Sequence, residues 1–276
     1  MTPIRHSVLT LALLGSMLNA RAGTLAQFHL RLGDILVELY DADKPVTVSN
    51  FINYVHSGRY QDMFLHRWEH GFVVQGGGFW ITNRQTANAQ FAAVQTFGDI
   101  TNEYNTGHIY SNLYGTIAMA RVGGQTNSAS SQWFFNLGTN SFLDTVDGGF
   151  TVFGHVVAGT NTLDHFNTGQ GLWFDNSLQD PLSELPVLSP TPTFEDLVYA
   201  DISLPSPVKL QIHVGTDGAR ALSWNSLSNL VHNLEFAPSL KASWQTLVST
   251  NGTGATIEVK DLTPAISERF YRVRVQ

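Results

Sequence analysis

The most informative part of the sequence is residues 64–79, which read Phe64-Leu65-His66-Arg67-Trp68-Glu69-His70-Gly71-Phe72-Val73-Val74-Gln75-Gly76-Gly77-Gly78-Phe79. Its apolar run, Phe72 to Val74, is closed by three glycines, a pattern typical of a short strand followed by a bulge or a close backbone approach. A second stretch is Gly115-Thr116-Ile117-Ala118-Met119-Ala120-Arg121, continuing through Ser131-Gln132-Trp133-Phe134-Phe135-Asn136 to Phe142-Leu143-Asp144. Together they offer an arginine, a glutamine and several aromatic side chains, without a cysteine or a phosphate loop. Such a site binds an apolar group and polarises a carbonyl or an amide.

Composition limits the class of protein. The chain has 276 residues, of which 43% are hydrophobic and only 13% are charged, so its composition allows a large buried core. The 24 glycines and 10 prolines favour a turn-rich β protein over a helical bundle. The net charge is −7 and no cluster of lysine and arginine is present, which argues against nucleic acid or an anionic membrane as a partner.

Residues 1–22 have the pattern of a secretory signal. Arg5 and His6 precede an apolar run from Val8 to Leu18, and Ala20-Arg21-Ala22 fits a small-x-small cleavage site. The run is too short to span a bilayer, so we expect no membrane span after cleavage; an uncleaved anchor is the alternative. An exported chain without cysteine folds without disulfides, which favours a periplasmic or secreted protein of the bacterial cell envelope.

Local patterns predict the elements up to residue 204. Residues 28–32 and 35–40 predict a β-hairpin that turns at Gly33-Asp34. A helix is expected that has Pro45 near its first turn and ends before Gly58, because Val48, Phe51, Ile52 and Val55 recur at helical spacing. Further strands are expected at 115–120, 132–137, 150–157 and 197–204, with a short helix at 160–166 and a polar, loop-rich segment at 80–114.

A second domain is expected at the C-terminal end. Pro205-Ser206-Pro207 is a stiff linker, because proline fixes its own φ and biases the preceding residue to extended conformations. Residues 208–276 contain short alternating runs, which predict a small β-sandwich-like domain of unknown role. Its aromatic side chains, Trp224, Trp244 and Tyr271, form either a small core or a binding surface for an unknown ligand.

Residues 23–204 resemble the cyclophilins, a family of peptidyl-prolyl cis-trans isomerases, and are most similar to the exported bacterial branch. Three features carry the resemblance: the proline-started helix from Lys44 to Phe51, the motif from His66-Arg67 to Gly76-Gly77, and the later run of Ile117–Arg121, Ser131–Phe134 and Val152-Phe153-Gly154. The resemblance implies a mainly β fold, a closed eight-stranded antiparallel barrel with a helix over each end.

The resemblance also implies the site. Arg67 matches the catalytic arginine of the family, and the proline pocket would be built from Phe72, Val73, Phe134 and Leu143. The residues that would bind the peptide are Gln75, Ala120, Arg121 and Gln132. Phe142 stands where many eukaryotic members have tryptophan and Phe150 where they have histidine, and both belong to the expected substrate-binding set. His70 replaces a common proline and Leu65 a phenylalanine.

The implied chemistry requires no nucleophile, metal or cofactor. Rotation about the X–Pro amide breaks no bond, so the enzyme has only to bind the twisted amide better than the planar one. His66 and His70 flank Glu69, which suggests a metal site, but the zinc-protease pattern needs glutamate directly after the first histidine on a helix. The expected partners are proline-containing polypeptides.

Two other functions remain open. The chain could be a non-catalytic proline-binding chaperone, a hypothesis that the intact Arg67 and Gln75 oppose. It could also attach to a surface or a partner through residues 208–276, with the barrel as cargo. Arg67 has a simpler interpretation too, as a surface ion-pair partner of Glu69.

Overall fold

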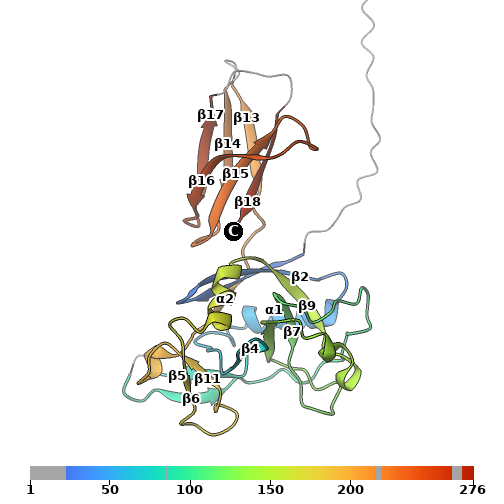
Figure 1. The fold of residues 1–276 in the computed structure, drawn as a ribbon, viewed down its shortest axis with the longest axis vertical. Coiled ribbons are helices and arrows are strands. Elements are labelled where there is room, and N and C mark those ends of the chain that lie inside the picture. Colours follow the sequence, from blue (N-terminus) through green and yellow to red (C-terminus); the bar gives the residue numbers. More distant parts are fainter. Residues whose placement is uncertain (1–22, 85, 216–218, 263–268) are drawn as a thin grey trace, which may run out of the picture.

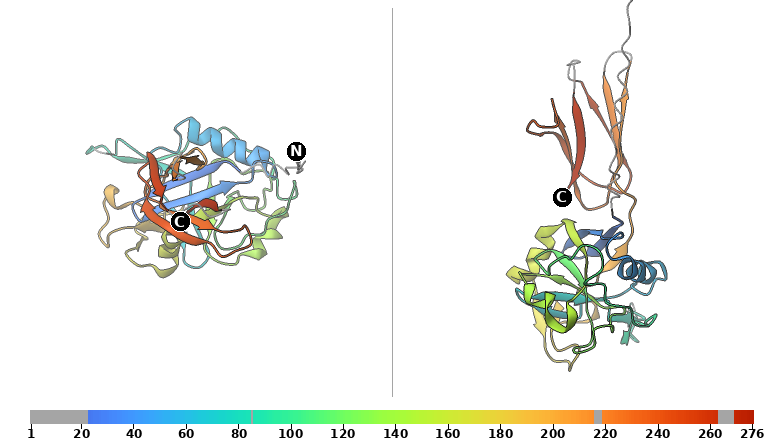
Figure 2. Two further views of the ribbon diagram at one scale, coloured as in Figure 1. Left: turned by 90° about the horizontal axis from the view of Figure 1, so that it is seen from above. Right: turned by 90° about the vertical axis from the view of Figure 1, so that its right-hand side faces the viewer.

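The computed structural model describes residues 23–84, 86–215, 219–262 and 269–276. The predicted signal at 1–22 lies outside these residues. Two β structures follow each other along the chain, a curled sheet with two α-helices and a smaller sandwich that stands on one side of it (Figures 1 and 2).

The larger body is built on one eight-stranded sheet in which all neighbouring strands are antiparallel. In the order in which they pair, the strands are β12 (Asp201–Ser203), β1 (Leu25–Leu30), β2 (Gly33–Leu39), β9 (Val152–Ala158), β7 (Thr116–Met119), β8 (Trp133–Asn136), β4 (Val73–Gly76) and β3 (Arg67–Glu69). The expected hairpin is present, but its turn is at residues 31–32, and Gly33 already belongs to β2.

The two ends of this sheet meet through segments that lead into its outer strands. The Leu65 N–H donates to the Val198 carbonyl at 2.9 Å, and the Ala200 N–H donates to the Met63 carbonyl at 3.0 Å. The predicted mainly β, eight-stranded antiparallel fold is therefore confirmed. Closure depends on these short bridges rather than on a continuous ladder between β3 and β12.

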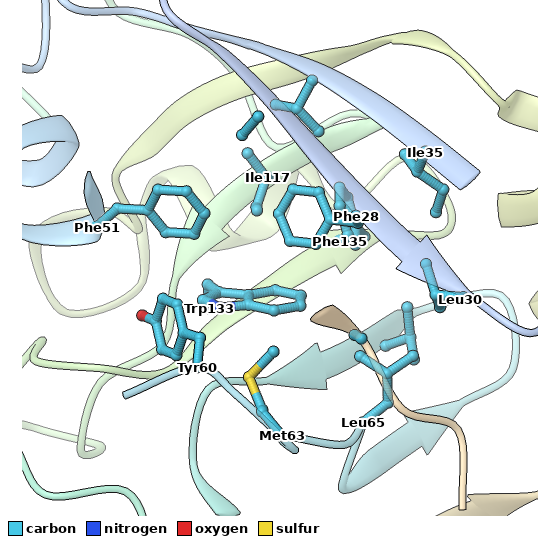
Figure 3. Close-up of a cluster of buried hydrophobic side chains, with 14 of the residues drawn as sticks. Phe28, Leu30, Ile35, Phe51, Tyr60, Met63, Leu65, Ile117, Trp133 and Phe135 are labelled. Carbon is cyan, nitrogen blue, oxygen red and sulfur yellow. The ribbon is translucent and has the colours of Figure 1, made fainter. Parts of the chain in front are cut away.

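The alternation of side chains along the strands separates a core from a site. Trp133 and Phe135 of β8 point inward, where they pack edge-to-face with Phe28 of β1 at ring distances of 5.0 and 5.1 Å (Figure 3). Phe134, between them, points to the opposite face. The inner face carries the main core, and the outer face is free to form a binding surface.

Helix α1 (Pro45–His56) and helix α2 (Thr160–Thr168) cover this core. Val48, Phe51 and Tyr54 of α1 are buried, whereas Ile52 and Val55 of the predicted stripe are only partly buried. The Glu103 carboxylate accepts hydrogen bonds from the first turn of α1, including one of 2.7 Å from the Thr47 N–H. The helix thus begins at its proline and is capped from a distant loop.

Two hairpins were not anticipated. Strands β5 (Phe79–Thr82) and β6 (Gln90–Ala93) lie within or next to the segment expected to be loop-rich, and β10 (Trp173–Asp175) pairs with β11 (Leu185–Val187) after α2. Short 3₁₀ turns occupy Ser141–Asp144, Val146–Gly148 and Phe194–Asp196. These short strands lack the clear alternation that identifies a longer one, which is why their pattern gives no signal.

The C-terminal region is a sandwich of two three-stranded antiparallel sheets, as expected. One contains β13 (Leu210–Val214), β14 (Arg220–Asn225) and β17 (Thr256–Asp261); the other contains β16 (Gln245–Asn251), β15 (Val231–Ala237) and β18 (Phe270–Val275). Trp224 is buried in its core and Tyr271 packs against that core. Trp244 is half-buried, with the Arg272 guanidinium 4.3 Å from the centre of its ring.

The sandwich contacts the barrel at β1, β2 and β9. Leu227 and Leu230 of the sandwich form one buried cluster with Leu36 and Ala158 of the barrel. Beside it, the Gln27 amide donates to the Ser228 carbonyl at 2.8 Å. The sandwich therefore rests on the barrel through a small apolar contact with a polar edge. Within the described ranges, no helix combines the length and apolar character needed to cross a membrane.

Candidate functional site

A row of paired residues crosses the outer face of the sheet. Arg67 of β3 stands opposite Gln75 of β4, Gln75 stands opposite Phe134 of β8, and Phe134 stands opposite Ala118 of β7. Directly paired residues of antiparallel strands share a face, so the row places a cation, an amide and an apolar ring side by side. Gln75 and Phe134 are 59 positions apart in the sequence, and the register of the strand pairs brings the four residues together.

Arg67 lies at the rim of this face, with 35% of its side chain exposed. Its Nε donates to the Glu184 carboxylate at 2.6 Å, and its Nη2 donates to the Glu69 carboxylate at 2.7 Å. The guanidinium carbon is 5.7 Å from the centre of the Phe72 ring. The expected ion pair with Glu69 exists, and Glu184 forms a second one; among the described residues, Nη1 has no hydrogen-bond partner.

A pair of amides forms the polar part of the site. The Gln75 Nε2 donates to the Gln132 Oε1 at 2.7 Å, which fixes both side chains next to Arg67. The Ala120 N–H donates to the Gln132 carbonyl at 2.9 Å, so the backbone after β7 follows the same edge. These groups are suited to hold an extended peptide by hydrogen bonds.

The apolar part of the site is a separate cluster on the outer face. Val73, Phe134 and Leu143 are buried in it, at 2%, 4% and 6% exposure, and Phe72 and Phe150 pack on them. The Phe134 and Phe150 rings meet edge-to-face at 5.9 Å. The four residues expected to form the proline pocket, Phe72, Val73, Phe134 and Leu143, are therefore in contact within one cluster.

Phe142 projects from the rim of this cluster. Its side chain is 55% exposed and stacks on Phe72 with ring centres 5.7 Å apart. The turn that carries it is held by amides, because the Asn140 Nδ2 donates to the Phe72 carbonyl at 2.8 Å. The Asn112 Nδ2 donates to Asp144 at 2.8 Å at the other end of the turn. Phe142 and Leu143 thus have a fixed position relative to Phe72.

Arg121 takes a different position from Arg67. Its Nη2 donates to the carbonyls of Val146 and Gly149 at 2.8 and 3.3 Å, and its guanidinium lies 4.2 Å from the centre of the Phe150 ring. Burial lowers the pKa of Arg121. Its side chain supports the wall at Phe150 and braces the loop at 146–149.

The two histidines next to the motif do not share a site. His66 is 2% exposed, and burial lowers its pKa to about 4, while His70 is exposed in the turn before Phe72. The Phe79 ring packs against His66 edge-to-face at 5.1 Å. In the part of the chain that the structure describes, no three histidine, aspartate or glutamate side chains converge as a metal site.

Glu184 is the residue of the site that sequence reasoning missed. It lies in the β10–β11 region, more than a hundred positions after Arg67, within a polar stretch that carries no motif. Only the backbone pairing of Trp68 with Glu184 brings its carboxylate to the arginine; the Trp68 N–H donates to the Glu184 carbonyl at 2.8 Å. No local pattern identifies such a contact.

The fold and the site together indicate the class of protein to which the chain belongs. A curled antiparallel sheet carries an arginine and two paired glutamines beside an aromatic cluster on its outer face, an arrangement suited to binding a peptide with one apolar ring. Residues 25–186 match the family described as cyclophilin type peptidyl-prolyl cis-trans isomerase. The chain belongs to this family.

Several curated peptidyl-prolyl cis-trans isomerases are similar in sequence to this chain over most of their own length. A peptidyl-prolyl cis-trans isomerase of Acinetobacter baylyi is 36% identical over 148 residues, which cover 53% of this chain and 73% of that protein. Peptidyl-prolyl cis-trans isomerase A of Dickeya dadantii is 38% identical over 166 residues, covering 59% and 82%. Peptidyl-prolyl cis-trans isomerase B of Escherichia coli is 37% identical over 145 residues, covering 51% and 82%.

Solved structures include a cyclophilin type peptidyl-prolyl cis-trans isomerase of Cryptosporidium parvum, determined in the presence of the dipeptide Ala-Pro. It is 21% identical with a TM-score of 0.44, and the match covers 66% of this chain and 99% of that one.

Proposed function

We propose that this protein catalyses cis–trans rotation of X–Pro bonds in exported polypeptides and assists their folding in the bacterial cell envelope. The isomerase activity follows from membership of the family, and the envelope location is supported by the sequence of residues 1–22. The observation that carries the proposal is the position of Arg67 at the edge of the cluster formed by Phe72, Phe134 and Leu143.

The chemistry requires selective binding of one amide geometry. The X–Pro bond has partial double-bond character, with a rotation barrier of about 18–20 kcal/mol, and uncatalysed rotation takes on the order of tens to hundreds of seconds. In the twisted amide the proline nitrogen becomes pyramidal and basic, so a hydrogen-bond donor stabilises it more than the planar form. Groups that bind the twisted state better than the ground state lower the barrier.

Arg67 has the donors for this step. A guanidinium has five N–H groups in a rigid fork, and the two carboxylates accept two of them. The remaining three have no hydrogen-bond partner among the described residues, so they are available to the proline nitrogen and to a peptide carbonyl. The apolar cluster would hold the ring and exclude water, which strengthens the electrostatic contact.

A peptide assay tests the activity. The chain from Gly23 to Gln276 should accelerate isomerisation of an Ala-Pro peptide, measured either by coupled proteolysis or by NMR exchange between cis and trans signals. The NMR assay separates catalysis from binding. A protein that binds the peptide without enhancing exchange would be a proline-binding chaperone instead.

The location is tested in the cells that make the protein. We expect a mature chain that begins at Gly23 in the periplasmic or secreted fraction, because a basic start, an apolar run and Ala20-Arg21-Ala22 precede it. Mass spectrometry of the fractionated protein measures its N-terminus. Recovery of the intact chain with Met1 from the cytoplasm would contradict the envelope role without affecting the isomerase activity.

A further inference from the structure

We propose that Glu184 is a positioning residue for Arg67, which fixes the guanidinium in the orientation that the twisted amide requires. This proposal rests on the isomerase function and adds to it a residue outside the aligned motifs. Two features support it: the direct ion pair between Glu184 and Arg67, and the rigid attachment of the segment that carries Glu184.

The β10–β11 hairpin is firmly attached beside β3. The Trp68 N–H donates to the Glu184 carbonyl at 2.8 Å, directly next to Arg67 in the chain. The Trp68 ring stacks on Phe174 of β10 with ring centres 4.4 Å apart. Leu185, the next residue after Glu184, is 1% exposed in a cluster with Phe64. The backbone of Glu184 therefore has a fixed position relative to the backbone of Arg67.

The ion pair occupies one edge of the guanidinium. Glu184 accepts from Nε at 2.6 Å and Glu69 accepts from Nη2 at 2.7 Å, so both carboxylates lie along the same part of the fork. The donors that stay without a partner among the described residues are both Nη1 protons and one Nη2 proton. These face away from the carboxylates, which makes a defined end of the group available to substrate.

The two carboxylates differ in how they constrain Arg67. Glu69 is two residues away on the same strand and is 49% exposed, so its contact is local. Glu184 comes from another element, and its bond to Nε acts at the root of the guanidinium. An arginine side chain has many rotamers, and fixing the Nε–H direction selects those that aim the fork at the Phe72 side.

Positioning outweighs the opposite electrostatic effect. A carboxylate beside Arg67 reduces the positive potential that the substrate meets, but the Glu184 side chain is 44% exposed, so water screens its charge. Misplacement of a catalytic group by about 1 Å can reduce the rate by roughly 100-fold. Loss of Glu184 should therefore lower activity rather than raise it.

The experiment compares three variants of Glu184 with a matched control in the full mature chain. Glu184→Ala should lower kcat/KM by about tenfold through kcat, with KM for an Ala-Pro peptide nearly unchanged, because the apolar pocket stays intact. Glu184→Gln retains an acceptor for the Nε–H and should recover part of the loss, while Glu184→Asp, one methylene shorter, should recover less. The control is Glu195→Ala, which removes the same charge from a nearby exposed carboxylate whose contact is Arg84, at 3.7 Å.

Combination with Arg67→Ala separates positioning from a structural role. If Glu184 acts through the arginine, Glu184→Ala should cost nothing further in the Arg67→Ala background. A loss of the same size in both backgrounds would mean that the hairpin is merely destabilised, and would overturn the proposal. Unchanged or increased kcat/KM in Glu184→Ala alone would overturn it too.

A measurement that does not depend on turnover distinguishes the proposed isomerase function from the proposed positioning role of Glu184. The NMR signal of the Arg67 Nε–H should be shifted downfield and protected from solvent exchange in the unmodified chain and in Glu195→Ala, and should lose both properties in Glu184→Ala. An unmodified chain with this protected signal but no isomerase activity would refute the proposed function while leaving the ion pair established. An exposed, rapidly exchanging signal in the unmodified chain would refute the positioning role.

Discussion

Arg67 of β3 and Gln75 of β4 stand directly opposite each other in an antiparallel pair, and Gln75 is in turn bonded through its amide to Gln132 at 2.7 Å. The pairing register places the cation beside these two amides. A shift by one residue in this register would turn Arg67 to the opposite face of the sheet. The site therefore depends on the same hydrogen bonds that form the fold.

Removing the Arg67 side chain should abolish most turnover and leave the fold intact. Its side chain is partly exposed at the rim, so Arg67→Ala leaves no cavity in the core. Hydrogen bonds of a charged group contribute about 1.5–3 kcal/mol, and each ~1.4 kcal/mol is tenfold in rate. We expect kcat/KM to fall at least ~10- to 100-fold, and Arg67→Lys to recover little, because an ammonium lacks the forked donors.

Circular dichroism and the peptide assay on the same preparations check this prediction. Arg31→Ala is the matched control, since Arg31 is an exposed arginine whose contact is the Glu195 carbonyl at 2.7 Å. A folded Arg67→Ala protein with near-normal activity would place the catalytic site elsewhere.

Phe142 should make the protein a poor target for cyclosporin. Many eukaryotic members of the family have tryptophan at this position, and phenylalanine cannot provide the hydrogen bond of the indole N–H. A polar group of the bound inhibitor that is buried without this partner costs about 1–3 kcal/mol. Because Phe142 is 55% exposed at the rim, Phe142→Trp can be accommodated and should tighten binding measurably. Titration calorimetry measures both affinities; nanomolar binding by the unmodified chain would be inconsistent with this account.

The barrel should fold and work without the sandwich, but with lower stability. Residues 23–204 contain the whole candidate site, while the contact with the sandwich involves Leu36 and Ala158, which do not belong to the apolar cluster of that site. Exposing one leucine side chain costs about 1.5–3 kcal/mol. We expect full isomerase activity and a reduced Tm for the fragment. An unfolded fragment would show that the two parts share a core.

His66 should make stability depend on pH below neutrality. Burial lowers its pKa from 6.5 to about 4, so the folded state resists protonation that the unfolded state accepts. The stability is fully present above pH 6.5 and is lost progressively as the pH falls from 6.5 to 4, by roughly 3 kcal/mol in total. Urea unfolding at pH 7 and pH 4.5 measures the loss, and His66→Gln should flatten this part of the profile.

A side chain at Gly77 should lower the free energy of unfolding. Its φ is +81°, and a Cβ there would lie 2.3 Å from the Ser131 carbonyl oxygen. Gly71 has a similar φ of +71° but open space around its Cβ position, so it is the matched control. Gly77→Ala should be less stable than Gly71→Ala by about 1–3 kcal/mol, the usual cost of overpacking. Equal free energies of unfolding would show that the loop at Ser131 yields easily.

From the amino-acid sequence, the elements with strong periodicity could be predicted, and so could the family; the proline pocket stays a prediction that the family resemblance implies. Val48 and Phe51 of α1 were predicted on the buried face from helical spacing and are buried, whereas Ile52 and Val55 are only partly buried and Tyr54 takes their place in the core. The motif from His66-Arg67 to Gly76-Gly77 carried the likeness to the family, which the comparison with the family confirms. Short strands such as β10 and β11 have too few residues to show a period, and they were missed.

Tertiary structure alone decided what surrounds the arginine and where the sandwich rests. Glu184 meets Arg67 because a backbone hydrogen bond from Trp68 holds the residue before β11 beside β3, and Leu36 meets Leu230 because the sandwich packs on the barrel. Such contacts join distant parts of the chain through backbone pairing and shape. The residues next to Glu184 and Leu230 in the sequence do not predict which side chains these two residues contact. The contacts form only after the strands have paired in their final register.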